Sequence, residues 1–190
     1  MMNIFNPFKV IFRLEPDAPA KPEKWILFTA LFVMIFFTLP VFSLAADADL
    51  LGEYYEQARM FMEQGRYREA IQYYEKIVDI DPDSAPAYNG LGIAHLELGD
   101  PLADVIWFFK VAIDIDPAYI EPYVNMCRVY YQKNQYDNAE SACLKVLELN
   151  PNLTAIQQTL AWVYLMGKSD PAKALRYFEE VQRSVNSPMV

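Results

Sequence analysis

A short tripeptide recurs along this 190-residue chain at a nearly constant interval, and that interval constrains the fold more than any single residue does. The three copies are Asp81-Pro82-Asp83, Asp116-Pro117-Ala118 and Asn150-Pro151-Asn152, so their prolines are 35 and 34 residues apart. Tyrosines recur in the same register, at Tyr54, Tyr88 and Tyr123. A period in this range indicates stacked supersecondary units rather than one globular core. Because stacked units usually offer a surface to partners, the period favours binding over catalysis.

Each period contains two stretches of apolar residues with helical spacing. In the first period these residues are Tyr54, Ala58 and Phe61, followed by Ala70, Tyr74 and Ile77. A turn at Gly65-Arg66-Tyr67 separates the two stretches, and the prolines end each period because proline cannot continue the preceding helix. The pattern predicts a unit of helix, tight turn and helix.

These features resemble the tetratricopeptide repeat family. The family's aromatic-x2-Leu-Gly-x2-aromatic motif reads YNGLGIAH over residues 88–95, with His95 at the second aromatic place. Its second-helix motif begins at Ala70, Val105 and Ala139, and a fourth copy at Ala174 lacks the closing proline. We therefore predict an all-α solenoid of four helix-turn-helix repeats, with eight antiparallel helices, at about 51–84, 85–119, 120–153 and 154–187.

An uncharged apolar run, WILFTALFVMIFFTLPVFSL, occupies residues 25–44 and is long enough to cross a bilayer. Basic residues precede it at Arg13, Lys21 and Lys24, whereas acidic residues follow it at Asp47, Asp49 and Glu53. By the positive-inside rule, the N-terminus is cytoplasmic and the repeats are periplasmic. We predict a cytoplasmic segment at 1–24, a single-pass transmembrane helix at 25–46 that anchors the chain in the inner membrane, and a repeat domain at 47–190.

Two alternatives remain open in this N-terminal part. A cleaved signal peptide is the first, because Ser43–Ala48 offers small residues spaced for signal peptidase. The long region before the apolar run and the length of that run favour a retained anchor instead. Within 1–24, Asn6-Pro7 followed by Phe8, Ile11 and Phe12 is typical of an amphipathic helix lying on the inner leaflet, and an unstructured tail is the alternative.

The charge balance and the motif search argue against several functions. The whole chain carries −9, and residues 1–46 hold four basic and three acidic side chains, so residues 47–190 carry −10. A domain this acidic is a poor nucleic-acid binder. The sequence has no Gly-rich phosphate loop, nucleophile elbow or paired-Cys metal spacing. Its one histidine, His95, cannot form a metal site unaided and is expected to be a buried structural imidazole. We expect no catalytic residue, no metal and no cofactor, and therefore not an enzyme.

Both cysteines, Cys127 and Cys143, fall in the third repeat, at core places on facing helices. An exported compartment is oxidising, so they could form a disulfide. The alternative is a pair of small buried hydrophobic side chains, since the distance between facing helices can exceed the reach of a disulfide.

The resemblance implies that the outward side of each first helix lines a concave binding groove. By register, that side carries Tyr55, Arg59, Met62, Asn89, Ile93, Val124, Asn125, Arg128, Tyr131, Gln158 and Trp162. Such a mixture suits an extended peptide or a partner's tail, and arginine forks bind carboxylates well. Some relatives clamp a C-terminal carboxylate with Lys and Asn, but Tyr55 and Arg59 stand at those places here, so we do not expect that clamp. Alternatively, Arg59 and Arg128 pair with Glu63 or Glu121.

Three further features concern the outer surface. Trp107 takes an outer-face place on the second helix of its repeat, which indicates either a contact point or packing on a neighbouring aliphatic stem. The second and fourth repeats each carry an extra residue, and we expect both to use it as an Asp-Pro start to the second helix, Asp100-Pro101 and Asp170-Pro171. The open face of helix 171–184, including Leu175 and Phe178, is expected to meet a partner or a second copy.

Together these features predict a membrane-anchored scaffold that contacts the bilayer through residues 25–44. Its partners would be other proteins, either peptide tails or subunits of an envelope membrane complex that the scaffold holds together or helps to assemble. The alternatives are a permanent accessory subunit of a respiratory or photosynthetic membrane complex, or a biogenesis factor for cytochromes or pili.

Overall fold

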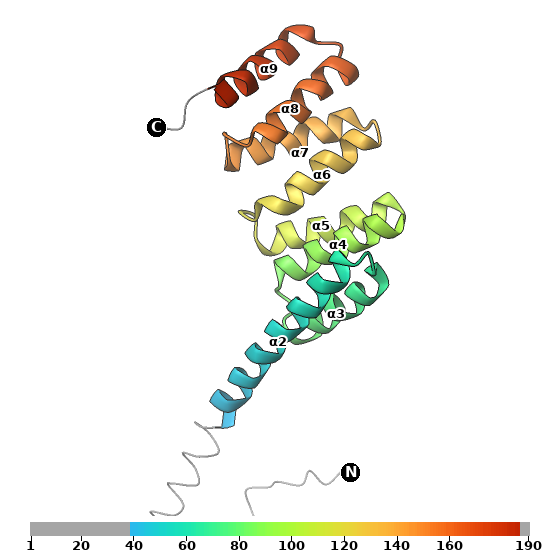
Figure 1. The fold of residues 1–190 in the computed structure, drawn as a ribbon, viewed down its shortest axis with the longest axis vertical. Helices are drawn as coiled ribbons and strands as arrows, with labels where there is room; N and C mark the ends of the chain where they lie inside the picture. The colour runs from blue at the N-terminus through green and yellow to red at the C-terminus, as the bar shows by residue number, and fades with distance from the viewer. Residues whose placement is uncertain (1–38, 187–190) are drawn as a thin grey trace, which may run out of the picture. The chain divides into compact units, whose positions relative to one another are not determined.

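The computed structural model describes residues 39–186, which form helices and connecting turns with no strand in that range (Figure 1). Contacts divide the chain into two compact units, 1–48 and 49–190, and the fold described below is that of the second. The helices, in chain order, are α2 (Leu39–Glu63), α3 (Tyr67–Ile80), α4 (Ala85–Leu98), α5 (Leu102–Ile115), α6 (Ile120–Gln132), α7 (Tyr136–Leu149), α8 (Thr154–Trp162), the π-helical turn η3 (Val163–Gly167) and α9 (Pro171–Asn186). The eight predicted helices of the solenoid are therefore confirmed as α2 to α9.

Successive helices pair antiparallel, and each pair stacks on the next (Figure 1). The first helices of the four repeats are α2, α4, α6 and α8, and the second helices are α3, α5, α7 and α9. The described part of α2 starts at Leu39, so the first helix extends further toward the N-terminus than the expected repeat start near residue 51, and no proline interrupts residues 41–63.

The recurring tripeptides form the turns between repeats, and their first residue explains the motif. The side chains of Asp81, Asp116 and Asn150 accept hydrogen bonds from the backbone N–H two residues later, at 3.3, 2.9 and 3.2 Å. Asp and Asn form such turns readily, and the intervening proline ends the preceding helix. The period read from the sequence is thus the period of these turns.

The turns between the two helices of each repeat share a different backbone feature. In each of them one residue has a positive φ: Gly65 (70°), Gly99 (81°), Asn134 (57°) and Ser169 (52°). Glycine adopts this left-handed conformation without a Cβ penalty, and asparagine tolerates it. Ser169 is the member of the set with the least favourable side chain for that backbone.

The fourth repeat departs from a regular helix pair. Tyr130 lies four residues before Asn134 in the third repeat, whereas Tyr164, its counterpart, lies five residues before Ser169. The extra residue of the fourth repeat is therefore placed inside the first helix, where it is accommodated by the π-helical turn η3. Gly167, at the end of η3, packs so closely on the Tyr136 ring that a Cβ there would overlap it.

The core is built mainly from small and branched side chains at the predicted helical places. Phe109, Ile77, Leu160, Val105, Val129 and Val146 are its largest fully buried members. One cluster joins the third and fourth repeats through Cys127, Cys143, Leu160 and Val163, and a second cluster centres on Phe109 in the second repeat. Gly92 lets α4 approach α5, because a Cβ there would lie 2.5 Å from the Phe109 ring.

The predicted anchor lies mostly outside the described residues, and only its last part, from Leu39, belongs to α2. The proposed interfacial helix within 1–24 lies wholly outside them. Within residues 39–186, no helix has both the length and the apolar character needed to span a bilayer.

Candidate protein-binding groove

The first helices α2 and α4 form a hollow of about 270 Å³ at the junction of the first two repeats. Four predicted groove residues line it: Tyr55, Arg59, Asn89 and Ile93. Two phenols that the sequence analysis missed, Tyr74 and Tyr119, complete the walls. Tyr119 lies in the turn before α6, so the helical register that identified the other residues could not identify it. We call this site the groove hollow.

Two asparagines connect the first helices of the second and third repeats. The Asn125 side-chain amide donates to the Asn89 carbonyl oxygen at 3.0 Å, and the Asn89 amide donates to the Tyr119 hydroxyl at 3.5 Å. Both asparagines are buried, at 6% and 7% exposure. Buried amides of this kind must be hydrogen-bonded, and the remaining Asn125 oxygen accepts a hydrogen bond from Arg128. Asn125 therefore links the second and third repeats from a buried position, and its predicted part in partner binding stays a prediction, while Asn89 also lines the groove hollow.

Three tyrosine hydroxyl groups lie around the groove hollow. Tyr55 and Ser84 share a short hydrogen bond between their hydroxyl groups. Burial, followed by the nearby charge of Glu121, raises the pKa of Tyr119 to about 12. Burial is also the main cause of the raised pKa of Tyr55 and of Tyr74. These phenols therefore remain neutral hydrogen-bonding groups at physiological pH.

The two groove arginines do not pair with the glutamates proposed for them. Arg59 forms an ion pair with Glu56 at 2.7 Å, and its side chain remains 66% exposed. Arg128 donates to the Asn125 side-chain oxygen at 3.2 Å. Among the described residues, neither arginine forms an ion pair with Glu63 or Glu121. An exposed pair such as Arg59–Glu56 contributes little to stability, so the Arg59 guanidinium can exchange it for another carboxylate.

The remaining predicted groove residues do not form one continuous lining. Met62, Val124 and Tyr131 are half-buried, and Tyr131 packs edge-on against Tyr136 with ring centres 6.4 Å apart. Gln158 and Trp162 are exposed on α8, and Trp162 packs edge-on against Phe178. The groove hollow is therefore the part of the predicted surface where several residues converge.

The C-terminal repeat exposes an apolar surface, as expected for Leu175 but not for Phe178, which is half-buried. Trp162, Leu165 and Met166 add to this surface, with Met166 62% exposed. Regular helical periodicity does not predict Leu165 and Met166 on this surface, because the π-helical turn shifts the residues after Val163.

On the outer side, Trp107 is 55% exposed and its indole packs edge-on against Phe108, with ring centres 5.0 Å apart. It lines a second hollow of about 390 Å³ together with His95, Asp100, Pro101, Asp104 and Phe108. His95 is only half-buried, which corrects the expectation of a fully buried imidazole. It stacks on Phe108 and its Nδ1 lies 2.6 Å from the Asp100 carboxylate.

One of the two Asp-Pro pairs behaves as expected and the other does not. Asp170 caps α9, since its carboxylate accepts from the Lys173 backbone N–H at 3.0 Å. Asp100 does not cap α5, because Pro101 occupies the capping place and the Asp100 carboxylate turns to His95. The extra residue of the second repeat is located in the turn, so Asp100 lies one residue before the N-cap position of α5.

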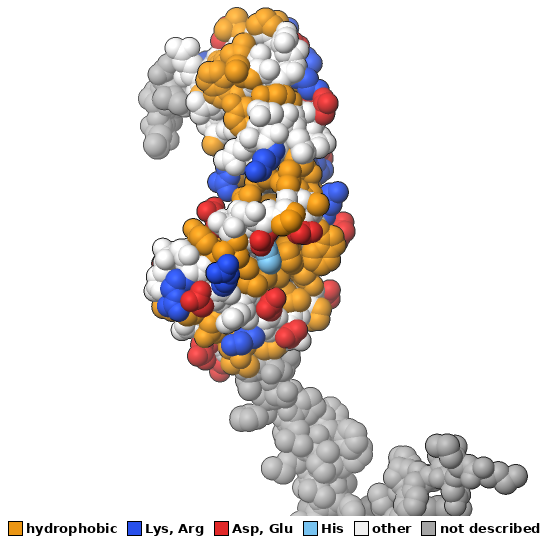
Figure 2. All heavy atoms as spheres, turned by 90° about the vertical axis from the view of Figure 1, so that its right-hand side faces the viewer, with side chains coloured by type: hydrophobic (Ala, Val, Ile, Leu, Met, Phe, Trp, Pro, Cys, Tyr) orange, Lys and Arg blue, Asp and Glu red, His pale blue; other side chains and the backbone are white. Residues whose placement is uncertain are grey.

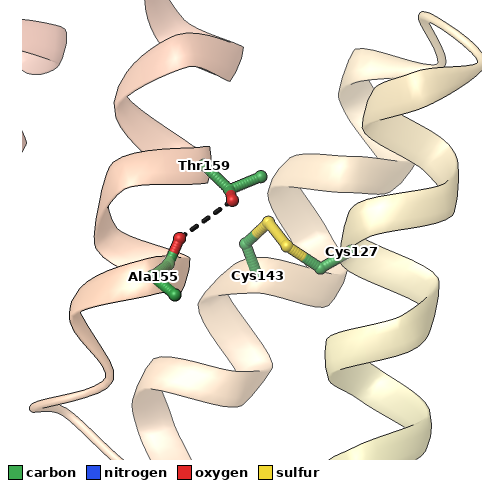
Figure 3. The surroundings of a disulfide bond; sticks show 4 residues. All are labelled: Cys127, Cys143, Ala155 and Thr159. Atoms are coloured by element: carbon green, nitrogen blue, oxygen red, sulfur yellow. Dashed lines mark hydrogen bonds between the residues drawn. A yellow bond between two sulfur atoms is a disulfide. The ribbon is translucent and has the colours of Figure 1, made fainter.

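Cys127 and Cys143 form a disulfide that joins α6 to α7, with α8 alongside (Figure 3). Their Cα atoms are 5.0 Å apart, which is within disulfide reach, and both residues are fully buried. The disulfide alternative is thus the one that the structure contains.

Two further observations concern metal binding and a hollow outside the predicted sites. Within the part of the chain that the structure describes, no group of three or more His, Cys, Asp or Glu side chains could hold a metal ion. A third hollow, of about 590 Å³ between α5, α6 and α7, is lined by residues such as Lys110, Tyr130 and Lys145, and no predicted site residue lines it.

Two segments of the chain match sequence models of this repeat class: residues 58–99 match "TPR repeat" and residues 120–153 match "Tetratricopeptide repeat". These two segments are thus tetratricopeptide repeats, and the part of the chain that the structure describes is an all-α repeat array. Among solved structures it is similar to MamA, with a TM-score of 0.65, 26% identity, and coverage of 75% of this chain and 82% of that one.

Curated relatives match over shorter stretches. The chain is 24% identical to Hsp70-Hsp90 organizing protein 2 of Arabidopsis thaliana over 106 residues, which is 56% of this chain and 18% of that protein. It is 30% identical to the chloroplastic tetratricopeptide repeat domain-containing protein PYG7 of the same plant over 103 residues, which is 54% of this chain and 31% of that protein. The chain therefore aligns with less than a third of the length of either relative.

Proposed function

We propose that this chain is a scaffold that binds partner proteins through its concave face and so holds together or assembles a membrane complex. The groove hollow is the observation that carries the proposal. It combines an exposed guanidinium, an amide, several phenols and the apolar Ile93 side chain in one cavity of about 270 Å³. A few polar groups over an apolar floor are typical of a recognition pocket.

The chemistry of the groove hollow favours an acidic group on an extended segment of the partner. Arg59 is the one Lys or Arg among its lining residues, and its present partner, Glu56, is an exposed and readily replaced carboxylate. An Arg–carboxylate contact is charge-assisted and directional. Neutral phenols at Tyr55, Tyr74 and Tyr119 offer further hydrogen bonds without repelling an anion.

The proposal includes the location and topology of the chain in the cell. Residues 25–44 would anchor the chain in the cytoplasmic membrane by a single pass, with the N-terminus in the cytoplasm and the repeats in the periplasm. The Cys127–Cys143 disulfide supports this topology, because disulfides persist in oxidising compartments and are rare where thiols are kept reduced.

A permanent accessory subunit of a respiratory or photosynthetic membrane complex is the second candidate. Four exposed apolar side chains of the fourth repeat, Trp162, Leu165, Met166 and Leu175, favour it, since a partner that covered this surface would remove apolar area from water. A subunit would keep this surface covered and co-purify in fixed stoichiometry, whereas an assembly scaffold would bind transiently through the groove hollow.

The test is affinity purification of the full chain from its own membranes in mild detergent, with mass spectrometry of the bound proteins. We expect Arg59→Gln to lose the partner several-fold, because a hydrogen bond to a charged group is typically worth about 1.5–3 kcal/mol. Arg176→Gln, the same change at an exposed arginine on α9, serves as the matched control and should retain the partner. Equal retention by both variants would exclude the groove hollow as the binding site, and a partner present in fixed stoichiometry would favour the accessory subunit.

A further inference from the structure

The hollow beside Trp107 is separate from the groove hollow, and no predicted groove residue lines it. We call it the His95 hollow. Its lining comes from the end of α4 (His95), the turn (Asp100 and Pro101) and the first half of α5 (Asp104, Trp107 and Phe108). Figure 2 shows the face that carries the chain's single histidine, with acidic and hydrophobic side chains adjoining it.

The aromatic pair in this hollow has counterparts in two other repeats. His95 stacks on Phe108 with ring centres 4.8 Å apart. At the same places of the first and fourth repeats, Phe61 stacks on Tyr73 at 5.5 Å and Tyr164 stacks on Tyr177 at 5.7 Å. One aromatic side chain from each helix of a repeat thus forms a stacked pair near the turn.

In the first and fourth repeats, a cation from the chain itself lies over this pair. The Arg66 guanidinium is 4.4 Å from the centre of the Phe61 ring, and the Lys173 ammonium is 4.8 Å from the centre of the Tyr164 ring. The negative face of an aromatic ring attracts such a cation. The pair near the turn is therefore a place where this chain already holds basic side chains.

The second repeat has the aromatic pair but lacks the cation. Where the fourth repeat has Lys173 and Arg176, the second repeat has Asp104 and Trp107. No Lys or Arg lines the His95 hollow, and among residues 39–186 no basic side chain other than His95 pairs with Asp100, and none pairs with Asp104. The hollow therefore presents two carboxylates and an exposed indole beside an aromatic pair whose counterparts in the first and fourth repeats each lie under a cation.

We propose that the His95 hollow binds an arginine side chain of a partner protein, as a second docking site beyond the groove. A guanidinium can stack on the exposed Trp107 indole and donate two parallel hydrogen bonds to one carboxylate, which a lysine ammonium cannot do. Asp104 is the better acceptor of the two, because the Asp100 carboxylate is already engaged by His95 at 2.6 Å. Asp104 also lies in the first turn of α5, where the helix dipole opposes a cation, so both the indole and the carboxylate are needed.

The test uses the full chain, labelled with 15N, and two short peptides, acetyl-Gly-Arg-Gly-amide and the same peptide with citrulline in place of arginine. Citrulline has nearly the shape of arginine but no charge. We expect the arginine peptide to shift the Trp107 indole N–H signal in a saturable way, with the citrulline peptide much weaker. The Trp162 indole signal in the same spectrum serves as an internal reference, and Trp107→Phe assigns the signal.

Asp104→Asn should weaken binding of the arginine peptide several-fold, whereas Asp114→Asn, an equally exposed charge loss later on α5, should leave it unchanged. Arg59→Gln should also leave it unchanged, which separates this site from the groove hollow. Equal binding of the two peptides, an unaltered affinity for Asp104→Asn, or the absence of a saturable shift at Trp107 would each overturn the proposal.

Discussion

The second and fourth repeats each carry an Asp-Pro pair between their two helices, yet the two pairs lie at different places of the helix start. Asp170 is the residue before α9 and caps it, with Pro171 as the first helical residue. Asp100 lies one place earlier, closes the end of α4 through its backbone, and bonds His95 with its side chain. The same dipeptide therefore has two structural roles.

The difference follows from where each repeat places its one extra residue. In the second repeat Val105, the first core residue of α5, lies six residues after Gly99, whereas Ala174 of α9 lies five residues after Ser169. The fourth repeat absorbs its extra residue earlier, in η3. One placement opens the His95 hollow and the other exposes Leu165 and Met166, so insertions shape the two exposed surfaces that distinguish these repeats.

The largest expected effect concerns the disulfide. Its removal should destabilise the third and fourth repeats more than the second. Cys127 and Cys143 belong to the core cluster shared with the fourth repeat, whereas the second repeat has its own cluster around Phe109. Closing a loop of this size stabilises by about 3 kcal/mol in the chain-entropy model. In a repeat array, that loss falls first on the units whose core contains the cross-link. Cys127→Ser/Cys143→Ser should therefore raise hydrogen exchange in α6 to α9 far more than in α5.

Reductant added to the native chain should reproduce this pattern, and the double variant should no longer respond to reductant. Thiol labelling after denaturation without reductant gives a direct check. Two free thiols per chain isolated from its own compartment would contradict the disulfide. A uniform rise in hydrogen exchange across α5 to α9 would contradict the expected difference between the repeats.

The next effect tests the close packing of η3. Because a Cβ at Gly167 would overlap the Tyr136 ring, Gly167→Ala should lower the unfolding free energy by about 1–3 kcal/mol, the usual range for overpacking. Gly52→Ala on α2 is the control, since no atom lies within 4 Å of its Cβ position and alanine favours a helix. Urea unfolding of the full chain would compare them. An unaltered midpoint for Gly167→Ala would show that Tyr136 moves aside at no cost.

The regular parts of the fold could be predicted from the sequence, because they rest on local rules that repeat. The turn prolines and the spacing of Ala70, Val105, Ala139 and Ala174 located the helix pairs correctly. The π-helical turn could not be predicted, since an insertion of one residue does not reveal whether the helix or the turn absorbs it. The role of Asn125 was missed for a related reason: register places a side chain on a face but does not show which neighbour across the repeat junction it bonds.

A smaller effect compares the two aspartates directly. Asp170→Ala removes a helix cap and should cost about 1 kcal/mol of unfolding free energy. Asp100→Ala removes no cap, so its cost in unfolding free energy should be smaller. The lost contact should appear in the NMR signals of the His95 ring. Equal destabilisation by the two substitutions would contradict the assignment of different roles.

The smallest expected effect is a gain in stability. It concerns Ser169, which stands in the fourth repeat where the second repeat has Gly99. Ser169 has φ 52°, at the turn place that Gly99 fills with φ 81°. A residue with a Cβ pays roughly 1–2 kcal/mol in this left-handed region, whereas glycine loses about 0.5–1 kcal/mol through the entropy of the unfolded chain. Ser169→Gly should therefore stabilise the protein by up to about 1 kcal/mol, and Gly99→Ser, whose Cβ would enter open space, should destabilise it by a similar amount. Paired thermal melts of the full chain would measure both signs, and a loss of stability in Ser169→Gly would show that the serine side chain makes a compensating contact in the turn.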